Sequence, residues 1–373
     1  MTGYILTLAI LSLFYMLALI WILLGLERIR MRFTDDKPFV SVVVAARNEQ
    51  YNIRSLLTTL TRQTYSDTRY EIIIVDDESK DDTAAIANSF NDPLIRVVQT
   101  SGRSKVVSPK KNAINLGIQN ARGDIILLTD ADCLPPIGWI EGMVRLFAPN
   151  VGMVIGFSPA ELPRLRFPFG HLLALESMSL AAIAAGTAGR GYPATCNGRN
   201  LAYRKNVYEQ VGGFERINNF ISGDDDLMLK LVQRTEWKIQ YAYDAALSVP
   251  TQLVKNAKQF ANQRLRHASK GFFYDLKKVI GLMLAYFYNL LILLSLPLAL
   301  FHTLSLWAPV VFIGLKSLFE FVLLYQFAAT MQRRHFLSVF PLAEILHVPY
   351  VVFFGALGPF IKFKWKEKEN RHA

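Results

Sequence analysis

Cysteine is scarce in this 373-residue chain, which contains only Cys133 and Cys196. Two residues give no disulfide framework of the kind that holds small secreted domains together. The count agrees with a protein whose soluble part lies in a reducing compartment such as the cytoplasm.

The two common glycine-rich phosphate motifs are also missing. The chain has no GxxxxGK[ST], and no GxGxxG follows the first predicted strand at residues 39–45. Their absence argues against a P-loop NTPase and against a dinucleotide-dependent dehydrogenase. If this protein binds a diphosphate, a metal ion and side chains must meet the charge of that group.

Charge is absent from residues 4–26, a run that exceeds the roughly 20 residues needed to cross a bilayer. No positive residue precedes the run and no small-residue cleavage site follows it, so a signal peptide is the weaker interpretation. Arg28, Arg30 and Arg32 come directly after it. Because positive residues stay in the cytoplasm, we expect a transmembrane anchor at 1–30 and a cytoplasmic chain beyond it.

Apolar residues make up 52% of the chain, and the excess lies at its two ends. Three apolar stretches follow residue 278, at 279–301, 302–330 and 340–363. Lys316 and Glu320 lie inside the second stretch, four residues apart, so on a helix they can pair. Three crossings would put the basic residues 362–368 outside, against the positive-inside tendency. Either one stretch is re-entrant or interfacial, or the tendency fails here.

The formal net charge is +11. Nucleic acid is one reason for such an excess, but these charges cluster beside apolar segments, at 28–32, 255–278, 333–334 and 362–368. Basic clusters in that position suit anionic lipid headgroups. We therefore expect a membrane as a partner and no nucleic acid.

The middle of the chain alternates short apolar strands with helices. Strands are predicted at 39–45, 71–75, 95–99 and 125–128, and helices at 52–60 and 111–120. Ser79 fits a helix N-cap with Asp82 three residues later. Alternation of this kind predicts an α/β fold, with helices on both faces of a mostly parallel sheet.

Acidic residues recur where these strands end. Asp76 and Asp77 follow the second strand, while Asp130 and Asp132 follow the fourth. Open parallel sheets bind ligands beyond the carboxyl ends of their strands, and paired carboxylates suit Mg²⁺ or Mn²⁺ carried with a substrate phosphate. A single acidic pair can be a turn or a cap, but several on one edge indicate a metal–diphosphate site. Lys110 and Lys111 are further candidates for the diphosphate.

A third acidic group opens the stretch SGDDDLMLKLVQR at residues 222–234. The apolar residues after it predict a helix, whose amino end favours carboxylates. Capping needs only one acid, and three adjacent ones repel each other. One of them could act as a general base on a hydroxyl group.

At this point the ordered motifs SVVVAARNE, EIIIVDDES, LLTDADC and SGDDDL resemble the family-2 type of inverting glycosyltransferase with the GT-A fold. Residues 263–267 (QRLRH) resemble the QxxRW signature of its membrane-bound members, with histidine in place of tryptophan. The resemblance covers residues 38 to about 270. It implies a Rossmann-like GT-A domain in the cytoplasm and transmembrane helices at both ends of the chain.

The resemblance also implies roles for individual residues. Catalysis would fall to Asp224 as general base, with Asp225 as the near alternative. Donor binding would use Ala45, Arg47, Asn48, Glu49, Asp76, Asp77, Lys110, Lys111 and Asp130, the metal would be held by Asp130 and Asp132, and the diphosphate and acceptor would meet Gln263, Arg266 and His267. The implied domains are an anchor at 1–30, a GT-A domain at 38–250, a basic interfacial segment at 251–278 and a transmembrane region at 279–373.

The expected reaction moves a sugar from a nucleotide-sugar, with UDP favoured, to a hydroxyl group near the membrane. A lipid acceptor is preferred, as in ceramide or carotenoid glycosyltransferases. The alternative is a growing polysaccharide, as in hyaluronan- or poly-N-acetylglucosamine-type synthases. The rivals from other classes are a membrane binding or transport protein and a metal-dependent nuclease. The expected location is a membrane with a cytoplasmic face, such as the bacterial inner membrane.

Overall fold

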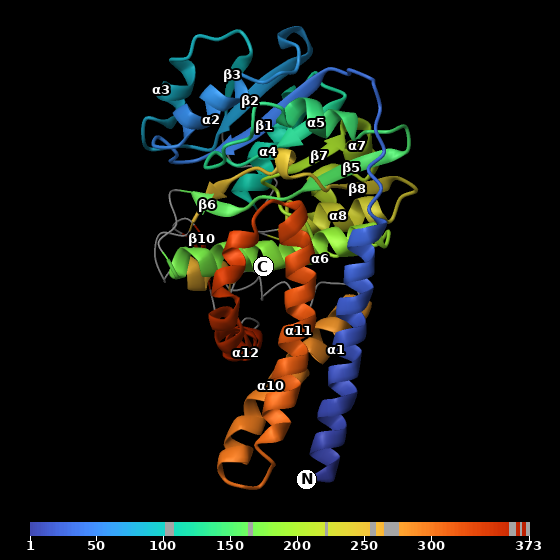
Figure 1. The fold of residues 1–373 in the computed structure, drawn as a ribbon. Coiled ribbons are helices and arrows are strands. Elements are labelled where there is room, and N and C mark those ends of the chain that lie inside the picture. Colours follow the sequence, from blue (N-terminus) through green and yellow to red (C-terminus); the bar gives the residue numbers. More distant parts are fainter. Residues whose placement is uncertain are drawn as a thin grey trace.

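The computed structural model describes residues 1–100, 108–162, 167–220, 223–253, 259–264, 276–357, 363–365 and 368–370. An α/β domain lies at one end of the molecule, and long apolar helices extend from it (Figure 1). The strands are β1 (Val40–Ala46), β2 (Tyr70–Asp76), β3 (Ile95–Gln99), β4 (Ile125–Leu128), β5 (Val151–Gly156), β6 (Ala160–Leu162), β7 (Leu201–Arg204), β8 (Lys238–Ala242), β9 (Thr251–Gln252), β10 (Phe363–Trp365) and β11 (Lys368–Asn370). The helices are α1 (Thr2–Arg28), α2 (Ile53–Leu60), α3 (Thr83–Asn88), α4 (Pro109–Asn120), α5 (Trp139–Arg145), α6 (Phe169–Gly189), α7 (Lys205–Gln210), α8 (Asp226–Gln233), α10 (Leu276–Leu300), α11 (Trp307–Thr330) and α12 (Phe340–Leu357).

The central sheet is mostly parallel, as the sequence predicts. Its strand order is β3-β2-β1-β4-β7-β5-β8, and only β7 runs antiparallel, between β4 and β5. In β1, Val43 packs in one hydrophobic cluster, whereas Val42 and Val44 pack in another on the opposite face. Successive side chains of a strand point to opposite faces, so a sheet covered on both faces requires the uninterrupted apolar run.

One predicted helix start is wrong. Ser79 does not cap a helix, because α3 begins at Thr83 and Asp82 is its N-cap residue. The Ser79 hydroxyl instead accepts a hydrogen bond from the backbone N–H of Asn48 at 3.0 Å. The serine therefore connects the loop after β2 to the loop after β1.

Five helical segments are long and apolar enough to cross a membrane, and they include all of the stretches that the sequence predicts. Three of them, α1, α10 and α11, run side by side away from the α/β domain (Figure 1). Only 17–22% of the apolar window in each is buried, compared with 56% for α6. Large apolar side chains such as Leu13 and Leu17 of α1 are half exposed, as lipid-facing residues would be.

Of the other two segments, α6 runs across the end of this bundle and lies beneath the sheet (Figure 1). It packs against α1 almost backbone to backbone. A Cβ atom at Gly25 of α1 would overlap the carbonyl group of Gly186, and one at Gly189 would overlap the carbonyl group of Gly25. Small residues permit such close helix packing, and here they fix the anchor to the underside of the α/β domain.

The carboxyl-terminal part returns towards the α/β domain. Helix α12 starts beside that domain and extends along only part of the bundle, and the hairpin of β10 and β11 lies at the level of α6 (Figure 1). Because the segment Arg334–Leu357 is also long and apolar enough to cross a membrane, the choice among the topologies that the sequence leaves open stays a prediction.

The predicted pairing of Lys316 with Glu320 is present within α11, at 2.9 Å. The Lys316 ammonium group is fully buried and also lies 3.0 Å from Glu344 Oε2 and 3.0 Å from His347 Nδ1, both in α12. Tyr15 of α1 donates a hydrogen bond to Glu320. The three N–H groups of the lysine thus have three acceptors, and this cluster joins α1, α11 and α12.

Candidate active site

The predicted polar groups gather at one edge of the sheet, where the parallel strands end. Ala46 at the end of β1 is paired with Asp76 of β2, and Val43 of β1 is paired with Leu128 at the end of β4. This register brings the segments that follow the three strands to one rim. Parallel sheets bind their ligands at this edge.

Lys110 joins two of the acidic groups on the rim. Its Nζ lies 2.9 Å from Asp130 Oδ1, after β4, and 3.0 Å from Asp224 Oδ2, before α8. The side chains of Lys110, Asp130 and Asp224 are 26%, 31% and 13% exposed. Burial would lower the pKa of Lys110, but the two carboxylates outweigh that effect and hold the pKa above its ordinary value. A charged ammonium group therefore bridges two carboxylates that are distant in the sequence.

Asp132, the second carboxylate after β4, is mostly buried and lies near the negative charge of Asp130. Burial and the Asp130 carboxylate raise the pKa of Asp132 to about 6, while Arg199 acts in the opposite direction. Thr251 Oγ1 donates a hydrogen bond to Asp132 Oδ1 at 3.5 Å. A buried carboxylate whose pKa is raised by another carboxylate would be stabilised by a cation.

The three consecutive acids at the start of α8, residues 224–226, differ in their contacts. Asp225 Oδ1 accepts a hydrogen bond from the backbone N–H of Asp226. Asp226 Oδ1 accepts from the Thr195 hydroxyl and from the backbone N–H of Cys196. Asp226 therefore holds the 195–196 segment, whereas Asp224 reaches the rim and contacts Lys110. Space at this carboxylate depends on Gly198, where a Cβ atom would lie 3.2 Å from Asp224 Oδ2.

The loop after β1 forms the other half of the rim. Arg47 Nη1 lies 3.3 Å from Asp77 Oδ2. Asn48 has a positive φ of 56°, and its side-chain oxygen accepts a hydrogen bond from the backbone N–H of Lys80. Asp76 Oδ1 is buried and has no hydrogen-bond partner among the residues that the structure describes. A buried acceptor without a donor is costly, so this oxygen suits a ligand that brings an N–H group.

Lys111 lies differently from its neighbour. Its Nζ donates hydrogen bonds to the carbonyl oxygens of Ile217 and Phe220, at 2.9 and 2.8 Å, and the residue is fully buried. These bonds hold the segment that leads to the acidic triplet and turn the ammonium group towards the protein interior. Its predicted contact with the donor stays a prediction.

Three residues are predicted to meet the diphosphate and acceptor, and the structure describes only one of them, Gln263, in a helical stretch at 259–264. Arg266 and His267 lie outside the described residues. The neighbouring Arg264 forms an ion pair with Glu176 of α6, and Tyr350 of α12 donates to the same carboxylate at 2.7 Å. The helical stretch is thus tied to both α6 and α12.

Sequence reasoning missed Thr251. The family resemblance implies part of an acceptor wall at residues 197–203 (NGRNLAY), which include Gly198 and Arg199, but it does not predict their contacts with the carboxylates. Arg199 and Gly198 lie in the stretch NGRN just before β7, and Thr251 begins β9. The antiparallel insertion of β7 beside β4 brings that stretch to the acidic group. No local periodicity in the sequence predicts that β7 pairs with β4.

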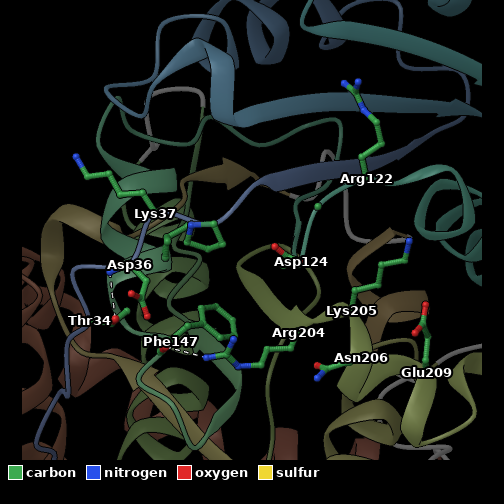
Figure 2. Close-up of a pocket in the computed structure, with 13 residues that line it drawn as sticks. Thr34, Asp36, Lys37, Arg122, Asp124, Phe147, Arg204, Lys205, Asn206 and Glu209 are labelled. Carbon is green, nitrogen blue, oxygen red and sulfur yellow. Dashed lines mark hydrogen bonds between the residues drawn. The ribbon is translucent and has the colours of Figure 1, made fainter.

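A cavity of about 700 Å³ lies at the opposite edge of the sheet. It opens among residues that precede β1 and β4, such as Lys37 and Asp124, together with Lys205 at the start of α7 (Figure 2). Lys205 Nζ donates to the carbonyl oxygen of Ala121, and Arg204 donates to that of Val151. These cations serve the fold, and the cavity lies far from the carboxylate rim along the strands.

Comparison with known proteins identifies the α/β domain. The model for "Glycosyl transferase family 2" matches residues 41–212. Glycosyltransferase AglE of Haloferax volcanii is 30% identical over 221 residues, which are 57% of this chain and 66% of that protein. A beta-monoglucosyldiacylglycerol synthase of Trichormus variabilis is 32% identical over 114 residues, 30% of this chain and 24% of that protein. The chain spans less than two thirds of the curated relatives it matches.

A solved structure shares the fold over nearly the whole length. It is the mannosyltransferase PcManGT of Pyrobaculum calidifontis in complex with GDP-Man and Mn²⁺. The TM-score is 0.56 at 16% sequence identity, and the match covers 98% of this chain and 100% of that one. The GT-A-like sheet with apolar helices at both ends is therefore a known arrangement.

Proposed function

We propose that this chain, whose α/β domain belongs to glycosyl transferase family 2, is a glycosyltransferase that moves a sugar from a nucleotide-sugar to a hydroxyl group at the membrane surface. One observation carries the assignment of the site. The Lys110 ammonium group contacts both Asp130, one of the two carboxylates after β4, and Asp224, the first of the three consecutive acids at 224–226. Metal-binding and base functions need such proximity, and structural caps do not.

The proposed donor is a nucleoside diphosphate sugar, with UDP favoured. Asp76 Oδ1 is a buried acceptor without a partner in the described chain, and uracil and guanine both offer a ring N–H to such a group. Arg47, held by Asp77, supplies positive charge beside it. The mannosyltransferase with the same fold is bound to GDP-Man, so a GDP-sugar is the second candidate.

A divalent metal fits the residues present. Asp130 and Asp132 offer carboxylate oxygens, the ligands that Mg²⁺ and Mn²⁺ prefer. Burial, and after it the negative charge of Asp130, raise the pKa of Asp132, and the Lys110 ammonium group shows that a cation fits beside Asp130. When bound, the metal would act as a Lewis acid on the departing diphosphate.

The proposed reaction is a single displacement with inversion. Asp224 takes the proton of the acceptor hydroxyl as the oxygen forms its bond to the anomeric carbon. The bond from that carbon to the diphosphate oxygen breaks at the same time, and the nucleoside diphosphate leaves. Lys110 is placed to meet the diphosphate charge. General-base assistance of this kind contributes about 10²–10⁴-fold.

A lipid is the proposed acceptor. The beta-monoglucosyldiacylglycerol synthase that resembles this chain is named for a lipid product. Helix α6 lies between the α/β domain and the bundle (Figure 1), and this arrangement keeps the rim near the membrane surface. In the described chain only α1, α10 and α11 extend fully from the domain, fewer helices than a pore for a growing polymer would need. The polysaccharide reading remains the alternative, and the domain is proposed to face the cytoplasm.

The proposal is tested by supplying donors to the purified full-length protein in lipid vesicles. Radiolabelled UDP- and GDP-sugars are incubated with Mn²⁺, and the products are extracted with organic solvent. Label that moves into the lipid phase supports the proposal, whereas insoluble polymer supports the polysaccharide alternative. If none of the donors transfers its label or releases free sugar or nucleotide, the protein is not a glycosyltransferase. The transport and nuclease alternatives would then remain.

Metal binding should depend on pH through Asp132. Because the pKa of this carboxyl group is raised to about 6, it is increasingly protonated below that pH and then cannot bind a cation. We expect Mn²⁺ to bind about tenfold more weakly at pH 5 than at pH 7.5, since one pH unit below the pKa leaves about a tenth of the group ionised. Mn²⁺ titration of the protein without nucleotide measures this. Asp132→Asn should bind weakly at both values, and equal affinity of the wild type at both would contradict the prediction.

A further inference from the structure

We propose that Lys110 is the cation of the donor-free site and leaves it when the donor arrives, so that divalent-metal binding depends on the nucleotide. This inference rests on the proposed function and deepens it. It differs from a simple diphosphate contact, because it assigns the lysine a partner before any substrate is bound. It also means that the lysine and the metal compete for Asp130.

The geometry supports a bridging role. The Lys110 ammonium group makes two contacts of 2.9 and 3.0 Å with carboxylates on separate elements. Lys110 lies in the first turn of α4, which Ser108 caps by accepting a hydrogen bond from the Lys111 N–H. Each of the three side chains is at least two-thirds buried. The lysine is therefore held by a rigid helix end between two groups that would otherwise repel each other.

The charges around it make simultaneous occupancy unfavourable. Among the described residues, Asp130, Asp132 and Asp224 contribute negative charge here, Glu49 and Asp225 add to it, and Lys110 and Arg199 contribute positive charge. A divalent ion on Asp130 would face the ammonium group across a few ångströms, where repulsion between like charges is strong in a partly buried site. A diphosphate changes the balance, because its oxygens can bind the metal and the lysine together.

The exchange has a consequence for the base. While Lys110 Nζ stays 3.0 Å from Asp224 Oδ2, the ammonium group occupies the position beside that oxygen where an acceptor hydroxyl would have to bind. Movement of the lysine to the diphosphate would free it. The donor would then have to bind before an acceptor hydroxyl can be activated.

The test measures Mn²⁺ binding by calorimetry to the full-length protein in detergent, with and without UDP or GDP. For the wild type we expect weak Mn²⁺ binding alone and at least about tenfold tighter binding with the nucleotide. Lys110→Met should bind Mn²⁺ about tenfold more tightly without nucleotide and gain little when it is added. Lys110→Arg keeps the charge and should resemble the wild type. Lys238→Met, at the amino end of β8 and exposed, is the matched control and should also behave as the wild type.

Thermal unfolding provides a second readout. Lys110→Met should unfold at a lower temperature than the wild type without metal, and Mn²⁺ should restore it, whereas Mn²⁺ alone should barely affect the wild type. A purely structural lysine would give a loss that Mn²⁺ does not repair. Unchanged Mn²⁺ affinity in Lys110→Met overturns the inference. If that variant does not fold, Lys110→Gln decides in the same way. Failure of the wild type to bind either nucleotide would instead count against the proposed function, since the metal-only comparison needs no nucleotide.

Discussion

Replacing Asp224 with asparagine should lower turnover by about 10²–10⁴-fold, the range that a general base contributes. Asparagine has nearly the shape of aspartate but cannot accept the proton of the acceptor hydroxyl. The residue is not a helix cap, because Asp225 is the N-cap residue of α8 and its Oδ1 accepts the hydrogen bond from the Asp226 N–H. The thermal unfolding temperature should therefore change little. Turnover is measured with the donor identified in the vesicle experiment.

Asp225→Asn is the matched variant, because the sequence leaves Asp225 as the alternative base. Asparagine keeps an oxygen that can accept from the Asp226 N–H, so the helix start should persist. We expect a loss of less than about tenfold, well below the range for a base. If Asp225→Asn loses more turnover than Asp224→Asn, the two roles must be exchanged.

Replacing Lys316 with methionine should destabilise the membrane bundle by about 3–5 kcal/mol, the usual cost of removing one partner from a buried ion pair. The change leaves Glu320 and Glu344 facing each other in an apolar environment without the cation that lies about 3 Å from both. The protein should lose yield and unfold at a lower temperature in detergent. The triple variant Lys316→Met, Glu320→Gln, Glu344→Gln removes the charges together and should recover most of the loss. Wild-type stability of the single variant would mean that the cluster is solvated.

Local patterns in the sequence predict half of the sheet well. The expected strands at 95–99 and 125–128 coincide with β3 and β4, and those at 39–45 and 71–75 differ from β1 and β2 by one residue at each end. Each is a short β-branched or aliphatic run bounded by polar residues, which is a strong signal. The position of β7, antiparallel between β4 and β5, depends on contacts distant in the sequence, and no local pattern encodes it.

The site divides in the same way. The convergence of Asp130 and Asp224 follows from motifs at strand ends, but the bridge between them depends on which of two adjacent lysines faces the rim. Lys110 and Lys111 are indistinguishable by composition, and successive residues of a helix point in directions about 100° apart. Packing of Lys111 against the carbonyl oxygens of Ile217 and Phe220 decides their orientation. Long-range packing of that kind cannot be read from one sequence.

The glycine contact between α1 and α6 has a consequence for any attempt to prepare the α/β domain alone. Without α1 and the rest of the bundle, the underside of the domain would present α6, a 21-residue helix that is mostly apolar. Such a fragment should adhere to detergent micelles or self-associate rather than stay dispersed in buffer. After cleavage of the anchor, the α/β domain should therefore still bind lipid surfaces through α6. The carboxylate rim would then stay close to the membrane interface.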